Sequence, residues 1–390
     1  MVLFLVLGII IFYQVICTSY LLLFAIAGSV AKASIPASAK IRLSYKIVVL
    51  IPAYKEDAVI IEVAKQSLLQ SYPESLYDVV IICDSLQHQT MMALNEMPVT
   101  LIEINFNNPT KAKAINAALQ HLPPYDIAVV LDADNIMDVH FLEKISHAFT
   151  KGFTIVQGHR IAKNTNTSIA VLDAVSEEVN NHIFRKGHCA LGLSSALIGS
   201  AMAFNYQYFK DTMATINAIS GFDKALELAI LKEQRYIHYA EDALVYDEKV
   251  QQIADFRKQR TRWMAAQIKY LLIHFLSGMI QLFKGNVNYF DKVFQFMLPP
   301  RVILLGTLLS TTLISALLQQ MPLFFISLIT SIMLIITFYI SIPRELLHKI
   351  SWRELYYIPV LFIQFILSTL QVHKARYTFL HTPHGEVKQK

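Results

Sequence analysis

The chain has 390 residues, of which 54% are hydrophobic and 16% are charged, and its formal net charge is +5. A soluble domain carries about 25% charged residues, so this composition excludes an ordinary soluble enzyme. The charge that remains is too high for a protein made only of membrane spans, and the apolar content excludes a disordered chain. We expect a polar domain joined to membrane-spanning helices. The mild positive charge favours phosphorylated small molecules or anionic lipid as partners and does not support nucleic acid binding.

Residues 1–31 contain no charged side chain, and about 20 apolar residues suffice to span a bilayer. A signal peptide is the alternative, because Ala31-Lys32-Ala33 resembles a cleavage site. However, the apolar run is too long for a signal peptide and no basic segment precedes it, so we expect a retained transmembrane helix at residues 1–31. The basic residues that follow predict a cytoplasmic location for the next domain. They are Lys32, Lys40, Arg42 and Lys46.

Residues 32–265 alternate between strand and helix patterns and predict one α/β domain with a mostly parallel sheet. The predicted strands cover residues 46–54, 78–84, 100–104 and 126–134, and the predicted helices cover residues 59–70 and 111–120. The cysteines, Cys17, Cys83 and Cys189, form no CxxC pair. We expect them to be reduced and structural, which agrees with a cytosolic domain and argues against a disulfide framework or a zinc site.

Residues 266–390 predict an interfacial helix followed by about three transmembrane helices. The apolar stretch 270–283 is short, which favours a helix lying in the membrane interface. The uncharged stretch 302–343 is long enough for two spans with a turn at 319–322, and 355–372 is a third candidate. Three such spans would place the tail outside, although its basic residues favour the inside. Either the last segment does not cross, or the helix at 270–283 does.

Asp132 and Asp134 end the predicted strand 126–134, in the sequence VVLDADN. Ligands of open α/β sheets bind at the carboxyl ends of the strands, and residues i and i+2 of a strand point to the same side. Two carboxylates so placed repel one another unless a cation or a donor-rich ligand lies between them, and a hard divalent cation shared with substrate phosphates is the natural occupant. The alternative is an acidic turn, since DxD alone is a common pattern.

Two further predicted strands end in polar residues. KIVVLIPAY ends at Pro52-Ala53-Tyr54, and DVVIICD ends at Asp84. Because the carboxyl ends of parallel strands meet at one edge of a sheet, we expect these side chains to converge with the DxD carboxylates on a nucleotide pocket. The alternative for Asp84 is a turn-forming residue.

Lys111 begins the predicted helix 111–120, in the sequence KAKAIN. The first turn of a helix can face a diphosphate, because its unpaired N–H groups and its dipole attract anions. The alternative is a solvated surface lysine. The sequence contains no GxGxxG and no GxxxxGKS/T segment, which argues against a dinucleotide-binding domain and against a P-loop.

Gln259, Arg262 and Trp263 lie in the segment FRKQRTRWMAAQ, residues 256–267. On a helix they are spaced i, i+3 and i+4 and therefore share one face. That face presents an amide, a guanidinium that binds anions in a bidentate manner and a large aromatic plate, which suits a diphosphate beside a sugar ring. The alternative is anchoring at the membrane surface, because several basic residues of this segment directly precede apolar sequence.

Taken together, these segments resemble the membrane-bound branch of glycosyltransferase family 2, which includes cellulose, hyaluronan and poly-N-acetylglucosamine synthases. The resemblance covers about residues 45–265. VLIPAYKED is similar to the opening strand of the family, KAKAIN to its KxxALN element, LDADN to its DxD motif and IGSAMAFNY to its GSGxAxR element, while QRTRW matches the QxxRW pattern. The occurrence of these motifs in this order is more specific than any one of them.

The resemblance implies a GT-A fold that binds a nucleotide-diphosphate sugar. It implies that Tyr54 and Asp84 contact the base, that Asp132 contacts the nucleoside, and that Asp134 holds Mg²⁺ or Mn²⁺ on the diphosphate. The implied nucleotide-sugar contacts are Pro52, Tyr54, Glu56, Asp84, Lys111, Asn116, Asp132, Gln259 and Arg262, and the implied acceptor contacts are Gly199, Ser200 and Trp263.

The family's general base is the last Asp of a TED-like motif, and two candidates exist here. Asp242, in YAED, is the closer match by eye, but residues 238–250 resemble the strand that follows the catalytic helix. FDKALELAILK, residues 222–232, resembles the start of that helix and lies the usual distance before QRTRW. We therefore expect Asp223 to be the base, with Asp242 as the alternative. Phe222 replaces the usual acidic neighbour, which leaves the pKa of the base less raised.

The tail TFLHTPHGE, residues 378–386, resembles the family's WxxTxH ending, with Phe379 in place of Trp, and implies a tail on the cytosolic side. We expect an integral protein of the cell membrane whose cytoplasmic domain transfers a sugar, UDP-linked in most of the family, to a glycan or glycolipid with inversion to a β-linkage. One alternative is a lipid glycosyltransferase that adds a single sugar to a polyprenyl or lipid carrier. Another is a membrane protein that binds nucleotide without catalysis. The sequence indicates no protein partner.

Overall fold

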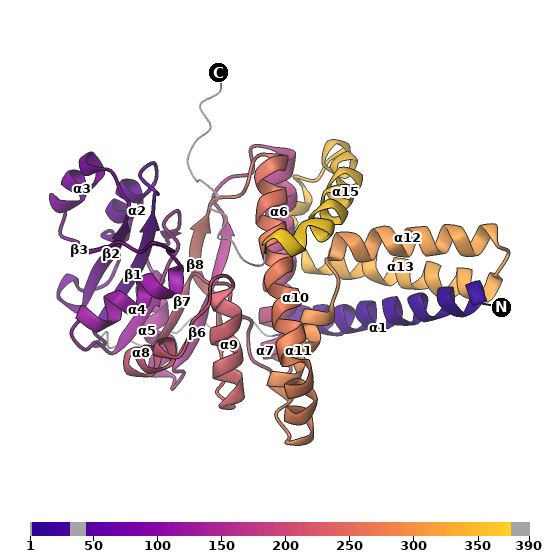
Figure 1. Cartoon of the computed structure of the whole chain (residues 1–390), viewed down its shortest axis with the longest axis horizontal. Coiled ribbons are helices and arrows are strands. Elements are labelled where there is room, and N and C mark those ends of the chain that lie inside the picture. The colour runs from indigo at the N-terminus through magenta and orange to yellow at the C-terminus, as the bar shows by residue number, and fades with distance from the viewer. Residues whose placement is uncertain (1, 32–43, 376–390) are drawn as a thin grey trace.

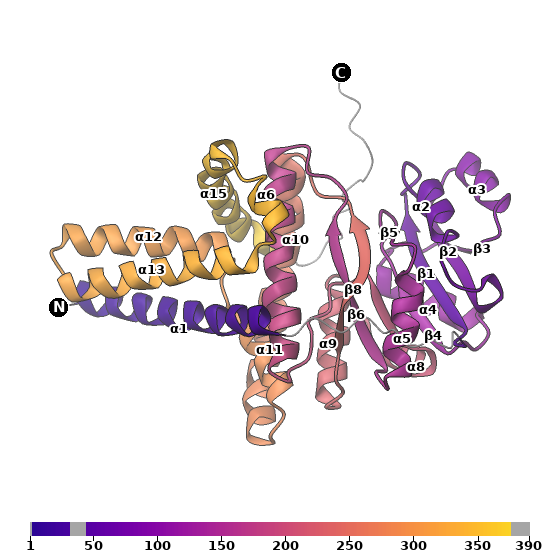
Figure 2. The same ribbon diagram turned by 180° about the vertical axis from the view of Figure 1, so that it is seen from behind.

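The computed structural model describes residues 2–31 and 44–375 (Figure 1). Lys32, Lys40 and Arg42, expected on the cytoplasmic side of the first helix, lie outside the described residues, as do the basic tail after residue 375 and the tail motif at 378–386. The polar domain forms one end of the molecule, and long apolar helices project from the other end (Figures 1 and 2).

The polar domain is built on an eight-stranded sheet with the order β3-β2-β1-β4-β7-β6-β8-β5. Strands β1 to β4 are mutually parallel and β6 is parallel to β8, but β7 is antiparallel to both β4 and β6. The sheet is therefore mixed rather than mostly parallel, because the chain enters β7 at the edge where β4 ends. The strands are β1 Ile47–Tyr54, β2 Tyr77–Asp84, β3 Thr100–Ile104, β4 Ile127–Val130, β5 Ile136–Met137, β6 Ile155–Ala162, β7 Met202–Asn205 and β8 His238–Asp247.

Helices cover both faces of this sheet, and the central strands are buried on both sides. Val48 and Leu50 of β1 face one core, while Ile47, Val49 and Ile51 face the other. Alternate residues of a strand point to opposite faces, so a continuous apolar run is what a strand covered on both sides requires. The covering elements are α2 Ile60–Ser67, η1 Glu74–Leu76, α3 His88–Asn95, α4 Lys111–His121, α5 Phe141–Thr150, α8 Tyr206–Ala214 and α9 Phe222–Lys232.

A layer of helices lies between the sheet domain and the projecting helices. It contains α6 Ser168–Asn180, the π-helix η2 Asn181–Gly187, α7 His188–Ala190, α10 Ile253–Phe283, α11 Val287–Met297, α14 Arg344–Leu347 and α15 Trp352–Ala375. The stretch 270–283, expected to form an interfacial helix, is the second half of α10. The domain boundary placed at residue 265 also falls inside α10. No Gly or Pro interrupts α10 before Gly278, so nothing in the local sequence ends the helix there.

Three helices project side by side from this layer (Figures 1 and 2). They are α1 Val2–Val30, α12 Arg301–Leu317 and α13 Met321–Ser341. Their shared interior is filled by apolar side chains, among them Leu21, Leu304, Leu308 and Leu334. At about 1.5 Å per residue each helix approaches or exceeds the thickness of a bilayer's hydrocarbon core.

The structure supports the expectation of membrane helices by length and composition. Among the described residues, Leu3–Val30, Met321–Ser341 and Trp352–Gln371 are each long and apolar enough to cross a membrane. A fourth candidate arises if α11 and α12, which are bent by 60° at their junction, count as one span. The expected turn between two spans falls between α12 and α13.

Candidate active site

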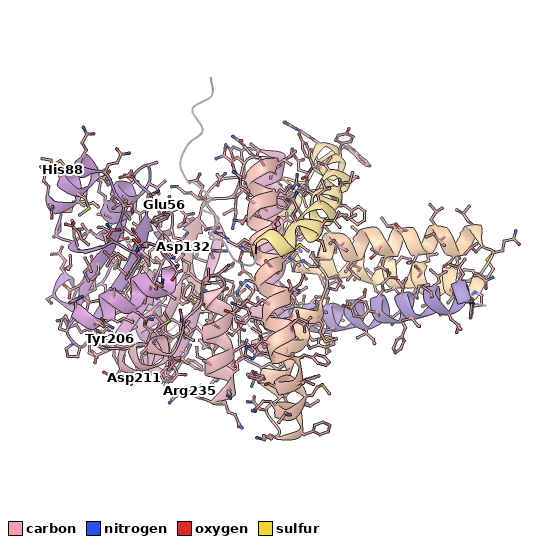
Figure 3. The ribbon with its side chains drawn as sticks, in the orientation of Figure 1. Glu56, His88, Asp132, Tyr206, Asp211 and Arg235 are labelled. Carbon is pink, nitrogen blue, oxygen red and sulfur yellow. The ribbon has the colours of Figure 1, made fainter. Side chains whose placement is uncertain are left out.

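The strand-end side chains predicted from the sequence converge at one edge of the sheet. β1 and β2 pair in register up to Tyr54 and Asp84, and β4 pairs with β1 on its other side, just before Asp132. Pro52, Tyr54, Glu56, Asp84 and Asp132 all line one cavity of about 420 Å³. Glu56 and Asp132 lie on the side of the domain that faces α10 (Figure 3).

Lys111 reaches this cavity from the first turn of α4. The preceding residue, Thr110, caps the helix by accepting a hydrogen bond from a backbone N–H of the first turn. The Lys111 ammonium contacts the Asp132 carboxylate and donates to the backbone oxygen of Gly199 at 2.7 Å. Lys111 is therefore held inside the cavity and is not a solvated surface lysine.

The two carboxylates of the DxD motif differ in their surroundings. Asp134 is 3% exposed and accepts a hydrogen bond from Asn135 Nδ2 at 3.2 Å. Asp132 is half-buried, and Arg160 lies 3.7 Å from it, opposite the Lys111 contact. The backbone N–H of Asp132 donates to Ser200 Oγ at 3.0 Å, which fixes the turn that carries both carboxylates. The motif is thus an organised part of the cavity wall.

Asp223 enters the cavity from the first turn of α9. The helix begins after Gly221, whose φ of +67° is a conformation that favours glycine. Gly199 has a φ of +84°, and a Cβ atom added to it would lie 3.7 Å from Asp223 Cβ. The loop of Gly199 and the start of α9 therefore meet in the cavity lining.

Asp242, the alternative base, lies on β8 with an exposed side chain. Its backbone oxygen accepts a hydrogen bond from Lys144 Nζ at 2.7 Å. It is absent from the residues that the structure places around the cavity, whereas Asp223 is present. The geometry therefore favours Asp223 over Asp242.

Gln259, Arg262 and Trp263 lie on one face of α10 and line the cavity together. Arg260 is not among the residues that line the cavity, and it forms an ion pair with Asp173 of α6, which does line it. The Arg260 guanidinium also lies 4.2 Å from the centre of the Trp263 ring, an arrangement that holds the indole in place. The spacing i, i+3 and i+4 therefore places Gln259, Arg262 and Trp263 on the face of α10 that lines the cavity, as predicted from the sequence.

The electrostatic setting of Arg262 suits an anion. Burial lowers the pKa of Arg262, and the nearby carboxylates of Asp132 and Asp223 act in the opposite direction. A guanidinium stays protonated under all such conditions. It can therefore supply fixed positive charge and several hydrogen-bond donors within the cavity.

Two residues implied by the resemblance do not line the cavity. Asn116 Nδ2 donates to the backbone oxygen of Met213 at 2.9 Å and so joins α4 to α8. Ser200 is fully buried, and its hydroxyl contacts both the DxD turn and Asn135. Both side chains support the site from behind the residues of the cavity surface. The other predicted residues are brought together.

The cavity also contains charged residues that no motif singled out. Arg160 of β6 lies 3.1 Å from Glu177 of α6 and 3.6 Å from Asp247 of β8. Arg185 of η2 and Lys249, just after β8, complete this group. Asp247 lies in the sequence VYDE, within the segment 238–250 that resembles the family. This resemblance could have identified Asp247 as a residue of the site. Arg160 and Glu177 have no comparable signature, because they meet only through packing.

The chemistry of the carboxylates fits a divalent cation that is also bound by a diphosphate. Among the described residues no group of three or more His, Cys, Asp or Glu side chains is arranged to enclose a metal ion. Mg²⁺ commonly takes only one or two carboxylates together with phosphate oxygens and water. Lys111 and Arg160 both contact Asp132, and Asp134 lines the same cavity two residues further along the chain. The DxD turn therefore brings a second carboxylate into the cavity, where a diphosphate and a divalent cation can share it.

The family model described as glycosyltransferase like family 2 matches residues 45–266 of the chain. Among solved structures, the chain is similar to the mannosyltransferase PcManGT from Pyrobaculum calidifontis in complex with GDP-Man and Mn²⁺. The identity is 14%, the match covers 86% of this chain and 97% of that chain, and the TM-score is 0.53. At this identity the likeness shows the fold alone, a GT-A-like α/β domain with several long apolar helices.

Two other solved structures match a smaller share of this chain. S. aureus TarS 1–349 in complex with UDP is 16% identical, with 57% of this chain and 65% of that chain covered and a TM-score of 0.39. Glucosyl-3-phosphoglycerate synthase from Mycobacterium tuberculosis, in complex with Mn²⁺, UDP and glucosyl-3-phosphoglycerate, is 13% identical, with 58% and 81% covered and a TM-score of 0.39. A comparison with curated proteins finds no match.

Proposed function

The chain belongs to family 2 of the glycosyltransferases, a family of nucleotide-sugar-dependent enzymes, and we propose that it is a membrane-embedded, inverting member of the membrane-bound branch. The proposed reaction moves a sugar from a nucleotide-diphosphate sugar, with UDP as the expected nucleotide, to a glycan or glycolipid acceptor at the cytoplasmic face of the cell membrane. The observation that carries this proposal is the meeting of Asp134, Asp223 and Trp263 in one cavity at the carboxyl edge of the sheet.

The proposed donor site occupies the sheet edge. Tyr54 and Asp84 would contact the base, and Asp132 the nucleoside. Lys111 and Arg262, with Gln259, would bind the diphosphate, because they place cations and amide donors around the same cavity. The mannosyltransferase of similar fold was solved with GDP-Man and Mn²⁺, which supports a nucleotide sugar as ligand.

Asp134 would hold Mg²⁺ or Mn²⁺ against the donor diphosphate. When bound, such an ion neutralises part of the negative charge that develops on a leaving diphosphate. The cations of this chain's own residues, Lys111 and Arg262, act on the same charge whether or not the ion is present. We therefore expect a variant that lacks the Asp134 carboxylate to lose its activation by Mg²⁺ or Mn²⁺.

The proposed chemistry is one in-line displacement at the anomeric carbon. The acceptor hydroxyl oxygen forms the new bond to that carbon, the bond to the diphosphate oxygen breaks, and the electron pair leaves with the diphosphate. Asp223 takes the proton of the hydroxyl. Trp263, held by Arg260, and the loop at Gly199 would position the acceptor sugar. A single displacement inverts the configuration, so an α-linked donor gives a β-linked product.

Phe222, which stands where the family has an acidic residue, changes the surroundings of Asp223. The Phe222 side chain is buried, and Lys111 Nζ lies 5.3 Å from the centre of its ring. Lys224 Nζ lies 3.5 Å from the Asp223 carboxylate. The side chains on either side of Asp223 in the first turn of α9 are therefore an aromatic ring and an ammonium.

The small membrane part favours a single addition or a short product over a long polymer. The interior of the α1–α12–α13 bundle is filled by Leu304, Leu308 and Leu334, with Phe24 at its base. Close packing leaves no room for a sugar chain along such a bundle. The second candidate function is therefore the addition of a single sugar to a polyprenyl or lipid carrier.

Activity variants test the proposal. Asp134→Ala and Asp223→Asn should each lower transfer by about 10²–10³ fold, because each removes a group that acts on the transition state. Asp242→Asn is the matched control and should keep the wild-type rate, since Asp242 is exposed outside the cavity. The measurement is release of nucleotide diphosphate from a donor panel, with and without Mn²⁺. Near wild-type turnover of Asp223→Asn together with loss in Asp242→Asn would reverse the assignment of the base.

A further inference from the structure

The turn that carries the two DxD carboxylates is held by a strand from a distant part of the chain. β4 ends at Val130, and the chain then runs through the DxD motif into the short strand β5. β5 lies at the edge of the sheet and pairs with β8, where Ile136 is opposite Tyr246. Because this pairing is antiparallel, the residue before β5 lies beside the residue after Tyr246. These two residues are Asn135 and Asp247.

Asp247 is linked to Asp134 through the side chain of Asn135. Asn135 Nδ2 donates to Asp247 Oδ1 at 3.0 Å and to Asp134 Oδ1 at 3.2 Å. Asn135 is fully buried, and its amide oxygen accepts a hydrogen bond from Ser200 Oγ. An ionised carboxylate only accepts hydrogen bonds, so the amide nitrogen and not the amide oxygen must face the two aspartates. The orientation of the Asn135 amide is therefore fixed on both sides.

Asp247 is linked to Asp132 through the guanidinium of Arg160. Arg160 Nη1 lies 3.6 Å from Asp247 Oδ1 and 3.7 Å from Asp132 Oδ2. Arg160 Nη2 donates to Glu177 Oε2 at 3.1 Å. A guanidinium is planar and rigid, so the contact with Glu177 also sets the direction of Nη1. One nitrogen of Arg160 is thereby held between the carboxylates of Asp247 and Asp132.

The two oxygens of Asp247 have separate partners. Oδ1 faces Asn135 and Arg160, and Oδ2 lies 2.7 Å from Lys249 Nζ. Asp247 and Lys249 are both buried. Burial alone would raise the pKa of Asp247, but the charges of Arg160 and Lys249 outweigh burial and hold this pKa below its usual value. Asp247 is therefore an ionised carboxylate that is held in one orientation.

We propose that Asp247 is a positioning residue for the DxD turn, which binds the donor diphosphate and its divalent cation. It acts on Asp134 through Asn135, and on Asp132 through Arg160. This inference rests on the proposed function and deepens it. Groups that orient the ligands of a metal ion affect its affinity nearly as much as the ligands do. The alternative is that Asp247 only offsets the buried charge of Lys249, and the two roles predict different results.

Two variants separate positioning from folding. Asp247→Asn keeps the shape of the side chain, but it leaves the buried Lys249 ammonium without its carboxylate and should lower the melting temperature. Asp247→Asn combined with Lys249→Met removes both charges and should recover most of the lost melting temperature. If Asp247 positions the DxD turn, the folded double variant still binds Mn²⁺ weakly.

Mn²⁺ binding is measured on the purified full-length protein with UDP or GDP, from the electron paramagnetic resonance signal of free Mn²⁺. A sample of nucleotide without protein gives the Mn²⁺ that the nucleotide binds by itself. We expect the dissociation constant of Mn²⁺ to rise by about 10–100 fold in Asp247→Asn and in the double variant. Glu241→Gln is the matched control and should bind as wild type does. Glu241 also lies on β8, 2.7 Å from Lys186, and is not among the residues that line the cavity.

Asn135→Ala is a second test, because it removes the link to Asp134 without changing any charge. It should raise the dissociation constant of Mn²⁺ by about tenfold. Wild-type Mn²⁺ affinity in the folded double variant or in Asn135→Ala would overturn the inference and leave the proposed function intact. If wild type itself binds no Mn²⁺ with either nucleotide and releases no nucleotide from any donor sugar, the proposed function is overturned.

Discussion

Lys111 is the single side chain at which four parts of the site meet. Its ammonium contacts Asp132 at the end of β4 and the backbone oxygen of Gly199, and it lies over the ring of Phe222 at the start of α9. The carboxylate of Asp132 balances the charge of Lys111. A donor diphosphate bound as proposed would share Lys111 with Asp132.

His238 provides a residue-level prediction on pH. Its ring stacks on Phe153 with centroids 3.8 Å apart. Burial, together with the positive charge of Lys151, lowers the pKa of His238 to about 4. As the pH falls below the usual histidine pKa, the unfolded chain gains a proton that the folded chain does not take up until about pH 4. The folded state therefore loses stability over this range and is unaffected by His238 above it.

The melting temperature in detergent, followed from pH 7 to pH 5, measures this loss. Wild type should lose a few degrees more than His238→Gln over the interval. The comparison of the two proteins removes the contribution of every other titrating group. An equal decrease in both proteins would mean that His238 binds its proton as readily in the folded chain as in the unfolded chain.

At the scale of elements, α9 is joined to α11 by a buried ion pair. Glu227 of α9 lies 2.8 Å from Lys292 of α11, and the side chains are 2% and 8% exposed. Glu227 also accepts a hydrogen bond from the backbone N–H of Leu197, in the loop that leads to Gly199. Asp223 lies one turn before Glu227 on the same helix. This pair therefore fixes the helix of the proposed base against the membrane-side helices and the acceptor-side loop.

Lys292→Met should weaken both stability and transfer. Removing one partner of a buried ion pair leaves an unpaired charge and costs about 3–5 kcal/mol. We expect kcat to fall with donor affinity unchanged, because the first turn of α9 loses its position while the nucleotide edge does not. Lys292→Arg should restore most of the rate, and Lys284→Met, at an exposed position, is the control. A destabilised Lys292→Met variant with unchanged kcat would show that the pair is only structural.

The elements themselves were largely predictable, and the exceptions have physical causes. The strand ends at Tyr54 and Asp84 were expected from local apolar runs, and the structure has them. The strand expected to run to Asp134 ends at Val130, so Asp132 and Asp134 lie in the segment that follows β4 and not on the strand itself. The sequence did not predict that α10 continues through the expected domain boundary at residue 265. The charged residues near this boundary do not end the helix, and the segment contains no helix-breaking residue before Gly278. The antiparallel β7 was not expected either, since strand direction depends on the path of the chain and not on strand composition.

At the scale of the whole molecule, the charges and helix directions favour three crossings. The domain end of the bundle carries Arg301, Arg344 and Lys349, whereas the turn between α12 and α13 at the far end has no charged residue. α15 packs on α10, α12 and α6 at the domain end. We propose that α1, α12 and α13 cross and that α15 lies at the interface. This arrangement gives an even number of C-terminal crossings and agrees with the positive-inside rule.

Cysteine labelling in intact cells tests this topology. In a Cys189→Ser background, Gln320→Cys should react with a membrane-impermeant maleimide from outside. Lys349→Cys and Leu370→Cys, before and near the end of α15, should react only after the membrane is opened. Cys17 and Cys83 are buried and should contribute little background. Reaction of Leu370→Cys from outside would show that α15 crosses the membrane.

Local patterns along the chain were enough to predict several features of the protein. Parallel strands bring their carboxyl ends to one edge, so the order of apolar runs was enough to place Asp84, Lys111 and Asp132 together. Helical periodicity alone placed Gln259, Arg262 and Trp263 on one face. The lengths of the uncharged stretches likewise indicated helices able to span a membrane.

Which of the candidate residues reach the cavity depends on how distant segments pack together, and the structure shows this directly. It placed Asp223 in the lining and Asp242 outside it, and it directed Asn116 toward α8. It also brought Arg160 and Glu177 together, because these residues belong to different elements and meet only when β6 packs against α6. Contacts of this kind depend on the packing of distant segments, and no spacing along the chain encodes them.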